Sequence, residues 1–421
     1  MQFVRTVKDG GRYDLIVCGA GPGGTAAAIA AAREGKHVLL MEAAGCLGGY
    51  WTSGLMGISL DMPGKGGLPK EILDKLLAKK RAEWVDGKSY TYDNEAMKLV
   101  LETMALDAGV DVLLYSRVTD VIMKNDRISA ILADGMTSMA FTADFFVDGT
   151  GHGRLGQLAG CSYSVGFEGR QQPGSLESVV TGVPLNLWKS NVHSREVKLK
   201  FKKMLMDVGV DCTYPMPLLF SLTPDQILHK MAINHQYGVS AEDDFGMSKA
   251  TLEARQEINR AAEALASIPG WESFTLAQTA EQLGLRDSRR IEGLYSVTVE
   301  DALSGRHFED AVSPVHFCLD VHHLAPDYRL PPEVEDYRFK PFDIPMRSLI
   351  SSQVNNLFMV GRCISGDFLA HSAYRTTCTA CALGEAAGLA ASRLHSEQSA
   401  KETDGIAVHR ELIQRGYHFA L

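Results

Sequence analysis

The stretch DLIVCGAGPGGTAAAIAAAREGKHVLLME, residues 14–42, constrains the fold more than any other part of the sequence. Its pattern predicts an apolar strand over Leu15–Cys18, a glycine turn, an alanine-rich helix and a second strand that ends at Glu42. The turn has the spacing G-x-G-x-x-G, at Gly19, Gly21 and Gly24. Strand, turn, helix and acid in this order predict a parallel α/β unit that binds a dinucleotide.

Each part of this unit has a physical task. The first glycine allows the tight turn, the second lets the backbone approach a pyrophosphate, and the third lets the helix pack on the strand. The helix is predicted over GGTAAAIAAAREG, directly after Pro22, and its N-terminal amides favour phosphate charge. Pro22, the three glycines and Glu42 are therefore expected cofactor contacts. The carboxylate of Glu42 can accept hydrogen bonds from ribose hydroxyls. A glycine-rich turn without a ligand is the alternative interpretation.

The bulk composition limits the remaining function classes. A chain of 421 residues favours two intertwined domains. A net charge of −9 without a dense Lys/Arg run argues against a nucleic-acid partner. Neither a signal peptide nor a membrane-spanning stretch is recognisable, so a cytoplasmic protein without membrane insertion is expected. The eight cysteines are then expected to be reduced. A homo-oligomer is compatible with the sequence.

Three further segments distinguish FAD from NAD. After Glu42, the loop AAGCLGGYWTSG resembles the flavin-contacting segment of glutathione-reductase-like flavoproteins. Residues 111–151 resemble that fold's inserted β-meander and its return to the nucleotide core. The segment from Leu357 resembles its C-terminal flavin segment. The resemblance implies cofactor contacts in these three segments, at Ala43, Cys46, Gly48, Gly49, Thr52, Val118, Gly149, Thr150, Gly151, Gly361, Arg362, Cys381 and Leu383.

In this order, the segments resemble FAD-dependent oxidoreductases distantly related to the fumarate reductase and aspartate oxidase flavoproteins. The resemblance implies an α/β fold: a Rossmann-like FAD-binding domain with a parallel sheet and β-meander, plus an inserted α+β substrate domain. We expect the FAD-binding domain at 1–160 and 340–400, the substrate domain at 161–339, and a C-terminal helical tail at 401–421. Only one G-x-G-x-x-G with a following helix is present, so a separate NAD(P)H domain is not expected.

Within the inserted region, three segments have helical patterns. Residues 194–209 begin with an N-cap serine, and residues 223–238 begin with a Thr-Pro capping box. A long charged helix is expected to end at Pro269 and Gly270. All three are most simply scaffold.

Candidate catalytic residues lie near the flavin segments, because the cofactor needs a positioned substrate and a proton acceptor or donor. His371 and Arg375 are four residues apart and would share a helix face. In the fumarate-reductase-like relatives, an arginine in the equivalent stretch clamps a substrate carboxylate, and Arg375 matches it by pattern. The alternatives are that Arg375 pairs with an acid or a phosphate, and that His371 is structural.

Two more clusters are candidates. In HFCLDVHHLAP, Asp320 and His322 would fall on one strand face, where the acid could orient the histidine as a base. Alternatively, both side chains are polar residues at a strand end whose hydrogen bonds are met within the protein. A metal site is not expected, because D-x-H alone supplies fewer than the usual three ligands. In GLRDSRRIEG, Arg286 or Arg290 could hold an anion near the flavin, or the arginines could form surface ion pairs.

The sequence therefore predicts an FAD enzyme that exchanges a hydride between flavin N5 and a small polar metabolite, with a carboxylate as a candidate anionic group. His371 or His322 would handle the proton, and the electron acceptor or donor stays open. One alternative is a thiol–disulfide oxidoreductase that uses the C-x-x-C pair Cys378 and Cys381, although packing against FAD explains these thiols more simply. The other alternative is a flavin subunit that only relays electrons.

Overall fold

The computed structural model describes residues 6–189, 194–328 and 330–419. Its main sheet has the strand order β6-β2-β1-β9-β8-β7, and β18 also pairs with β9. These strands are β1 (Lys8–Cys18), β2 (Val38–Met41), β6 (Asp111–Leu113), β7 (Arg117–Lys124), β8 (Arg127–Asp134), β9 (Ser138–Asp148) and β18 (Leu357–Met359). Strands β6, β2, β1, β9 and β18 run parallel, whereas β9, β8 and β7 form an antiparallel meander. The predicted α/β class with a parallel sheet and a β-meander is confirmed.

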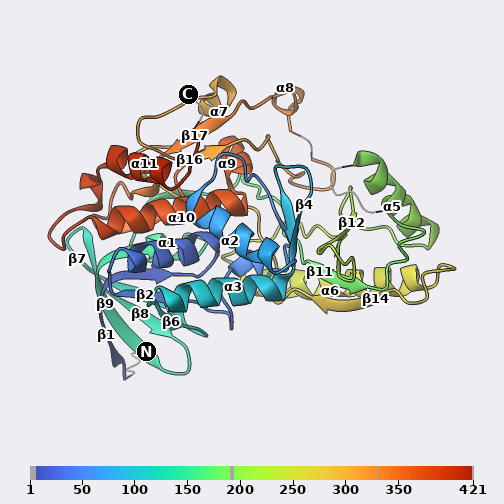
Figure 1. The fold of residues 1–421 in the computed structure, drawn as a ribbon, viewed down its shortest axis with the longest axis horizontal. Coiled ribbons are helices and arrows are strands. Elements are labelled where there is room, and N and C mark those ends of the chain that lie inside the picture. The colour runs from blue at the N-terminus through green and yellow to red at the C-terminus, as the bar shows by residue number, and fades with distance from the viewer. Residues whose placement is uncertain (1–5, 190–193, 329, 420–421) are drawn as a thin grey trace.

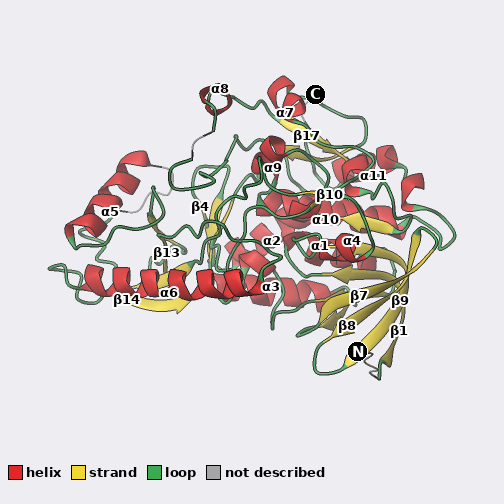
Figure 2. Ribbon diagram, turned by 180° about the vertical axis from the view of Figure 1, so that it is seen from behind, coloured by secondary structure: helices red, strands yellow, loops and turns green. Residues whose placement is uncertain are grey.

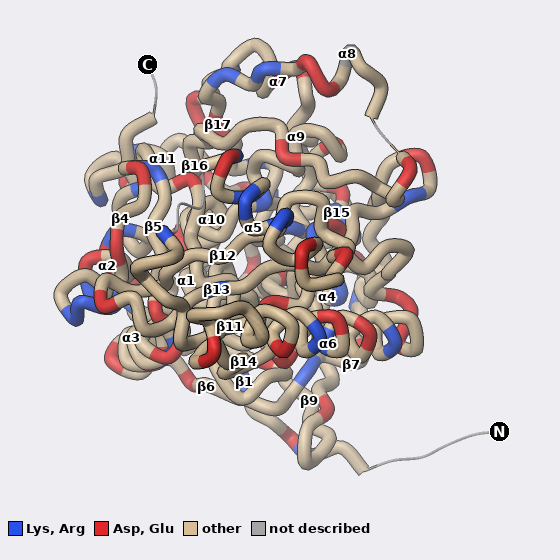
Figure 3. Tube along the Cα trace, turned by 90° about the vertical axis from the view of Figure 1, so that its right-hand side faces the viewer, with Lys and Arg blue, Asp and Glu red and all other residues tan. Residues whose placement is uncertain are grey.

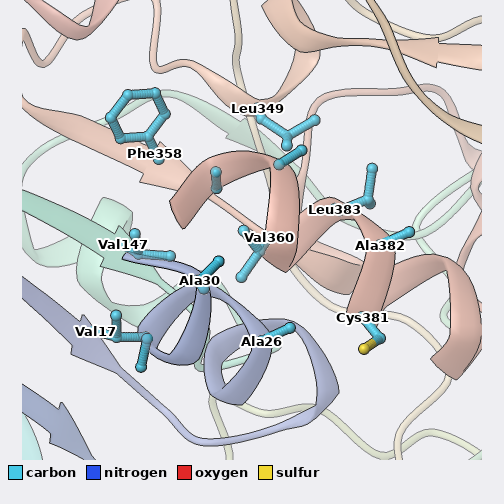
Figure 4. Packing of buried hydrophobic residues seen from close by; sticks show 14 of the residues in the cluster. Val17, Ala26, Ala30, Val147, Leu349, Phe358, Val360, Cys381, Ala382 and Leu383 are labelled. Atoms are coloured by element: carbon cyan, nitrogen blue, oxygen red, sulfur yellow. The ribbon is translucent and has the colours of Figure 1, made fainter. Parts of the chain in front are cut away.

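One alanine-rich helix packs on this sheet, and a second alanine-rich helix packs against the first (Figures 1 and 4). They are α1 (Pro22–Arg33) and α10 (Thr377–Ser392). Their backbones approach closely, because a Cβ on Gly384 would lie 1.9 Å from the carbonyl oxygen of Gly23. Figure 4 shows Ala26 and Ala30 of α1 on one side and Cys381 of α10 on the other. Small residues in both helices therefore fix the glycine turn against the C-terminal segment.

The same hydrophobic core extends into several smaller elements, and we call this part the cofactor body. Its remaining helices are α2 (Gly67–Ala78), α3 (Asn94–Asp107), α4 (Arg154–Leu158), α7 (Val299–Ser304), α9 (Phe368–Tyr374) and α11 (Gly405–Gln414). Its short strands are β3 (Ile58–Ser59), β4 (Ala82–Trp84), β5 (Tyr90–Tyr92), β10 (Tyr163–Ser164), β15 (Arg290–Ile291), β16 (Ala311–Val315) and β17 (Phe342–Pro345). The 3₁₀ turns are η1 (Gly49–Trp51), η2 (Met346–Leu349), η3 (Gly361–Cys363) and η4 (Ala400–Glu402), and α8 (Pro332–Glu335) lies on a long connection.

A second body has a separate hydrophobic core, formed by residues 176–285 together with Leu55 and Ile58. Its four-stranded sheet has the order β12-β13-β11-β14. The strands are β11 (Ser178–Thr181), β12 (Leu218–Ser221), β13 (His229–Ala232) and β14 (Thr275–Thr279), and the helices are α5 (Arg195–Asp207) and α6 (Asp244–Ala266). This body lies beside the main sheet in Figures 1 and 2. A list of core residues does not define where a domain begins or ends, so the expected substrate domain at 161–339 stays a prediction.

The structure confirms two of the three predicted helices in this region and contradicts one. Helices α5 and α6 form where the patterns place them. Residues 223–238 are not a helix: after a turn, β13 pairs with both β11 and β12, and all four of its residues are buried. The Thr223 hydroxyl donates to the Asp225 carboxylate within the turn instead of capping a helix. Burial of β13 between two strands therefore overrides the local capping signal.

Candidate cofactor and substrate site

A cavity of about 1030 Å³ connects the glycine turn of the cofactor body with the sheet of the second body. This volume is at the upper end of the range for ligand pockets, roughly 300–1,000 Å³, so it suits a large cofactor together with a small substrate. Thirteen of the cofactor residues proposed from sequence line it: Gly19, Gly21, Pro22, Gly24, Glu42, Ala43, Gly49, Val118, Gly149, Thr150, Gly151, Gly361 and Arg362.

The other five proposed cofactor residues do not line this cavity. The Cys46 thiol contacts the Thr52 hydroxyl at 3.7 Å, and that hydroxyl donates to the carbonyl of Leu47 at 2.5 Å. Gly48 has φ +102° and begins the turn η1. Cys381 and Leu383 are fully buried in α10. These residues therefore shape the loop and the helix packing behind the cavity wall, rather than the wall itself.

The glycine turn has the shape that a pyrophosphate needs. A Cβ on Gly19 would lie 2.6 Å from the carbonyl oxygen of Gly149, and a Cβ on Gly24 would lie 1.8 Å from that of Gly19. Gly21 differs, because its Cβ would meet only the Gly149 oxygen, at 3.9 Å. Gly19 and Gly24 thus permit close packing, whereas Gly21 leaves open space at the start of α1 for a ligand.

The Glu42 side chain is fixed at the end of β2. Its two oxygens accept hydrogen bonds from the backbone N–H of Ala20 at 2.7 Å and of Ala44 at 2.9 Å. Burial raises the pKa of this carboxyl, although these N–H donors oppose the shift. Each oxygen keeps a second lone pair, so the carboxylate can also accept from ribose hydroxyls at the cavity wall.

Arg286 lies on the cavity wall with neutral partners. Its Nη1 donates to the Pro173 carbonyl at 2.7 Å and to the Ser175 hydroxyl at 3.0 Å. Among the described residues it forms no ion pair. Arg362 also lines the cavity and donates to the carbonyl of Leu285. Arg286 and Arg362 thus line the cavity without an ion pair to a carboxylate among the described residues, and the charge of Arg286 contributes to lowering the pKa of Asp320.

Arg375 instead pairs with an acid, which is one of the two alternatives to substrate contact raised from the sequence. Its Nη2 donates to the Asp320 carboxylate at 2.7 Å and to the Asp320 carbonyl at 2.8 Å. Its Nε is buried without a hydrogen-bond partner among the described residues. Although burial alone would raise it, His322 and Arg375 hold the pKa of Asp320 below its ordinary value. Arg375 is therefore fixed at the cavity wall by Asp320, and its Nε is enclosed by protein.

His322 and Asp320 lie together at the cavity, but in a loop rather than on the expected strand, because β16 ends at Val315. His322 Nε2 lies 3.6 Å from the Asp320 carboxylate, and its Nδ1 lies 3.1 Å from Nε2 of His235. Burial and Arg286 lower the pKa of His322 to about 4, so the ring is neutral at pH 7. The acid and the histidine are thus assembled by a loop rather than by strand alternation.

His371 does not line the cavity. It is fully buried in α9, and its Nε2 lies 3.1 Å from the Arg362 carbonyl oxygen. Burial and Arg290 lower its pKa well below the ordinary value, so Nε2 donates as a neutral imidazole. Arg375 is the C-cap of α9, and its backbone N–H donates to the His371 carbonyl at 3.1 Å, so the two residues lie one helical turn apart, but only Arg375 reaches the cavity. His371 therefore holds the backbone of Arg362 in place through its Nε2 hydrogen bond.

Sequence reasoning missed several polar residues on the cavity wall. Lys230 of β13 forms an ion pair with Glu177 at 3.1 Å, and the Tyr50 hydroxyl donates to Glu177 at 2.8 Å. Tyr214 also lines the cavity. Lys230 is a charged residue in a strand whose four residues are all buried, but its partners come from distant segments that the sequence does not connect. No local spacing connects Tyr50, Glu177 and Lys230.

Cys378 and Cys381 both lie within α10 as free, buried thiols. The Cys378 sulfur lies 3.1 Å from the Ser59 hydroxyl. Burial raises the pKa of Cys378 to about 11 and that of Cys381 well above its ordinary value. Neither thiol lines the cavity. Both are therefore protonated packing groups in this structure, which does not favour thiolate chemistry.

Two other classes of site are not found in the described part of the chain. Its His, Cys, Asp and Glu side chains form no cluster of three or more that could hold a metal ion. Within residues 6–189, 194–328 and 330–419, no helix has the length and apolar character to cross a membrane. On the side seen in Figure 3, acidic and basic residues are interspersed along the trace.

The glycine turn, the acid after β2, the meander and the C-terminal return to the sheet define a flavoprotein-type dinucleotide fold. The chain belongs to the FAD dependent oxidoreductase family, whose model matches residues 14–412. Family membership makes FAD the cofactor, and the cavity wall described above fits it.

Individual relatives are more distant. The chain is 30% identical over 165 residues to a thiamine thiazole synthase of Aeropyrum pernix, covering 36% of this chain and 58% of the relative. It is 29% identical to that of Pyrococcus furiosus, covering 33% and 58%. The chain thus spans little more than half the length of these relatives. A geranylgeranyl bacteriochlorophyll reductase-like structure from Thermoplasma acidophilum matches 96% of this chain and 83% of its own, at 14% identity and TM-score 0.48.

Proposed function

We propose that this FAD-dependent oxidoreductase exchanges a hydride between flavin N5 and a small carboxylated metabolite. The observation that carries the proposal is Arg286, a cavity-lining guanidinium whose protein partners are neutral. A half-buried guanidinium without an ion-pair partner favours an anionic ligand, and a guanidinium matches a carboxylate with two parallel donors. The same cavity reaches the glycine turn, so the anion would share it with the cofactor.

The chain's own residues would bind, orient and exchange a proton. Arg286 would hold the carboxylate, and Arg375, fixed by Asp320, lines the same cavity with its guanidinium charge. Bound FAD supplies the hydride acceptor or donor. When a substrate carbon gives up a hydride, the proton on its neighbouring oxygen or nitrogen needs an acceptor. His322 is a neutral imidazole at the cavity and would be that acceptor, or the donor in the reverse direction.

Other candidate functions have weaker support. Thiol–disulfide exchange would need a reactive thiolate, but Cys378 and Cys381 are buried thiols behind the wall. The match to thiamine thiazole synthases covers about a third of this chain, so we do not extend their activity to it. The electron acceptor or donor, and a homo-oligomer, stay predictions from the sequence.

Anaerobic bleaching of the bound flavin tests the proposal. A panel of 2-hydroxy, 2-amino and saturated carboxylic acids should contain a member that bleaches the flavin, whereas its amide should not. Arg286→Gln should weaken that bleaching by roughly ten- to a hundredfold, the value of a lost charge-assisted hydrogen bond, and keep its FAD.

Arg170→Gln is the matched control, because Arg170 lies outside the cavity lining and packs over the Tyr328 ring. The control should bleach as the natural protein does. Equal bleaching by Arg286→Gln would overturn the anion site. Bleaching only by a reduced carrier protein, with no metabolite active, would favour the electron-relay alternative.

A further inference from the structure

Tyr214 is held rigidly at the cavity wall. It lies between α5 and β12, and its backbone N–H donates to the Ile233 carbonyl at 3.0 Å. Its ring stacks on His235, with ring centroids 4.3 Å apart and an interplanar angle of 31°. The backbone bond and the ring contact together fix the direction of the side chain, so the position of its hydroxyl is set before any ligand arrives.

The Tyr214 hydroxyl has no hydrogen-bond partner among the described residues. Tyr214 is half-buried and lines the cavity, and its hydroxyl oxygen is not fully enclosed by protein. Neighbouring wall groups are already engaged: Tyr50 donates to Glu177, and Arg375 donates to Asp320. The Tyr214 hydroxyl is therefore a fixed polar group with unused bonding capacity.

The chemistry of this hydroxyl defines what it would bind. Burial raises the pKa of Tyr214 to about 12, so the group keeps its proton near neutral pH and acts as a neutral donor. Among the surrounding charges, Arg286 has the largest effect on it, ahead of Asp320 and Glu177. Arg286 lines the same cavity as Tyr214, so a ligand whose carboxylate lies on Arg286 would share that space with this donor.

We propose that the Tyr214 hydroxyl donates a hydrogen bond to a second oxygen of the substrate, on the carbon next to the carboxylate, so that the substrate is a 2-oxo or 2-hydroxy acid. This inference rests on the proposed function and narrows its substrate class. A fixed donor that stays unpaired when the oxygen is missing gives stronger discrimination than an apolar contact does.

Matched pairs of acids test it. Pyruvate and propionate, 2-oxoglutarate and glutarate, and phenylpyruvate and 3-phenylpropionate are titrated into the FAD-bound protein, and binding is followed by the change in flavin absorbance and by the melting temperature. In at least one pair, the 2-oxo acid should bind about tenfold more tightly than its partner. Tyr214→Phe keeps the ring stack and should remove that preference. Tyr328→Phe, whose hydroxyl donates to Glu168 away from the cavity lining, should keep it.

The outcomes separate this inference from the proposed function. If no acid of any pair binds, both fail. If both members of every pair bind equally to the natural protein, the carboxylate site stands and the tyrosine inference is overturned. If Tyr214→Phe keeps the full preference for the 2-oxo acid, the carboxylate site also stands and the tyrosine inference is overturned. Loss of FAD or a lower melting temperature of the free Tyr214→Phe protein would point to a structural role and also overturn the inference.

Discussion

At the scale of single residues, the glycines of the turn have different tasks that only the structure separates. Gly24 lies where any side chain would collide with the Gly19 backbone, whereas Gly21 faces open space. Gly21 also has φ −62° and ψ −178°, an extended conformation that other residues adopt freely. A side chain at position 21 should therefore leave the fold intact and prevent the cofactor from binding.

Gly21→Val is accordingly expected to fold and to lose FAD. The valine side chain would occupy the space that the pyrophosphate needs, so flavin content per chain should fall at least about tenfold, as for a loss of more than 1.4 kcal/mol in binding. Flavin released by denaturation measures the content. Melting temperatures are compared on cofactor-free protein, because bound FAD itself stabilises the fold.

Gly24→Ala is the contrasting variant. Its Cβ would lie 1.8 Å from the Gly19 carbonyl oxygen, so the cofactor-free protein should itself melt at a lower temperature. A Gly21→Val protein that keeps one FAD per chain would contradict the assigned path of the pyrophosphate.

At the scale of elements, the sequence predicts those parts of the site whose residues lie close together along the chain. It does not predict contacts between residues that are far apart along the chain. The turn at Gly19, Gly21 and Gly24 and the acid Glu42 follow from spacing within one βαβ unit. Asp320 lies in a loop that brings it to Arg375. Glu177 directly precedes β11 and contacts Lys230 of the paired strand β13. Such contacts depend on how distant segments pack together in the fold, and the local sequence pattern carries no information about that packing.

The buried pair of Lys230 and Glu177 gives an element-scale prediction. Their side chains are 3% and 5% exposed. Lys230→Met should destabilise the protein by about 3–5 kcal/mol, because Glu177 is left as an unpaired charge. Lys230→Met combined with Glu177→Gln should recover most of that loss, since the amide oxygen still accepts from Tyr50. Urea unfolding of the three proteins checks this, and a double variant as unstable as the single one would contradict it.

At the scale of the whole molecule, the folded protein buries several histidines, and their burial lowers the free energy of unfolding at low pH. Several buried histidines have lowered pKa values. For His229, which is 1% exposed, burial lowers the pKa to about 4. The unfolded chain has a histidine pKa of about 6.5. Between these two values the unfolded state binds a proton that the folded state does not, so stability falls as the pH is lowered.

His229→Leu should remove part of this acid sensitivity. The ring nitrogens of His229 are buried without a close hydrogen-bond partner among the described residues, and a contact with the Ile227 backbone is the one interaction that opposes the lowered pKa. Leucine therefore leaves at most that backbone group unpaired. Stability at pH 8 should change little. Lowering the pH from about 6.5 to 4 should cost the variant about 3 kcal/mol less than the natural protein. Urea unfolding at a series of pH values measures this, and parallel pH profiles of the two proteins would contradict the prediction.

The central claim is that FAD and an anionic substrate share one cavity. The most direct measurement is the absorption spectrum of the bound flavin during titration with a simple carboxylate such as propionate. The account predicts a saturable shift of the flavin bands in the natural protein, and its loss in Arg286→Gln with FAD still at one per chain. A shift that survives Arg286→Gln unchanged, or no shift with any carboxylate, would contradict it.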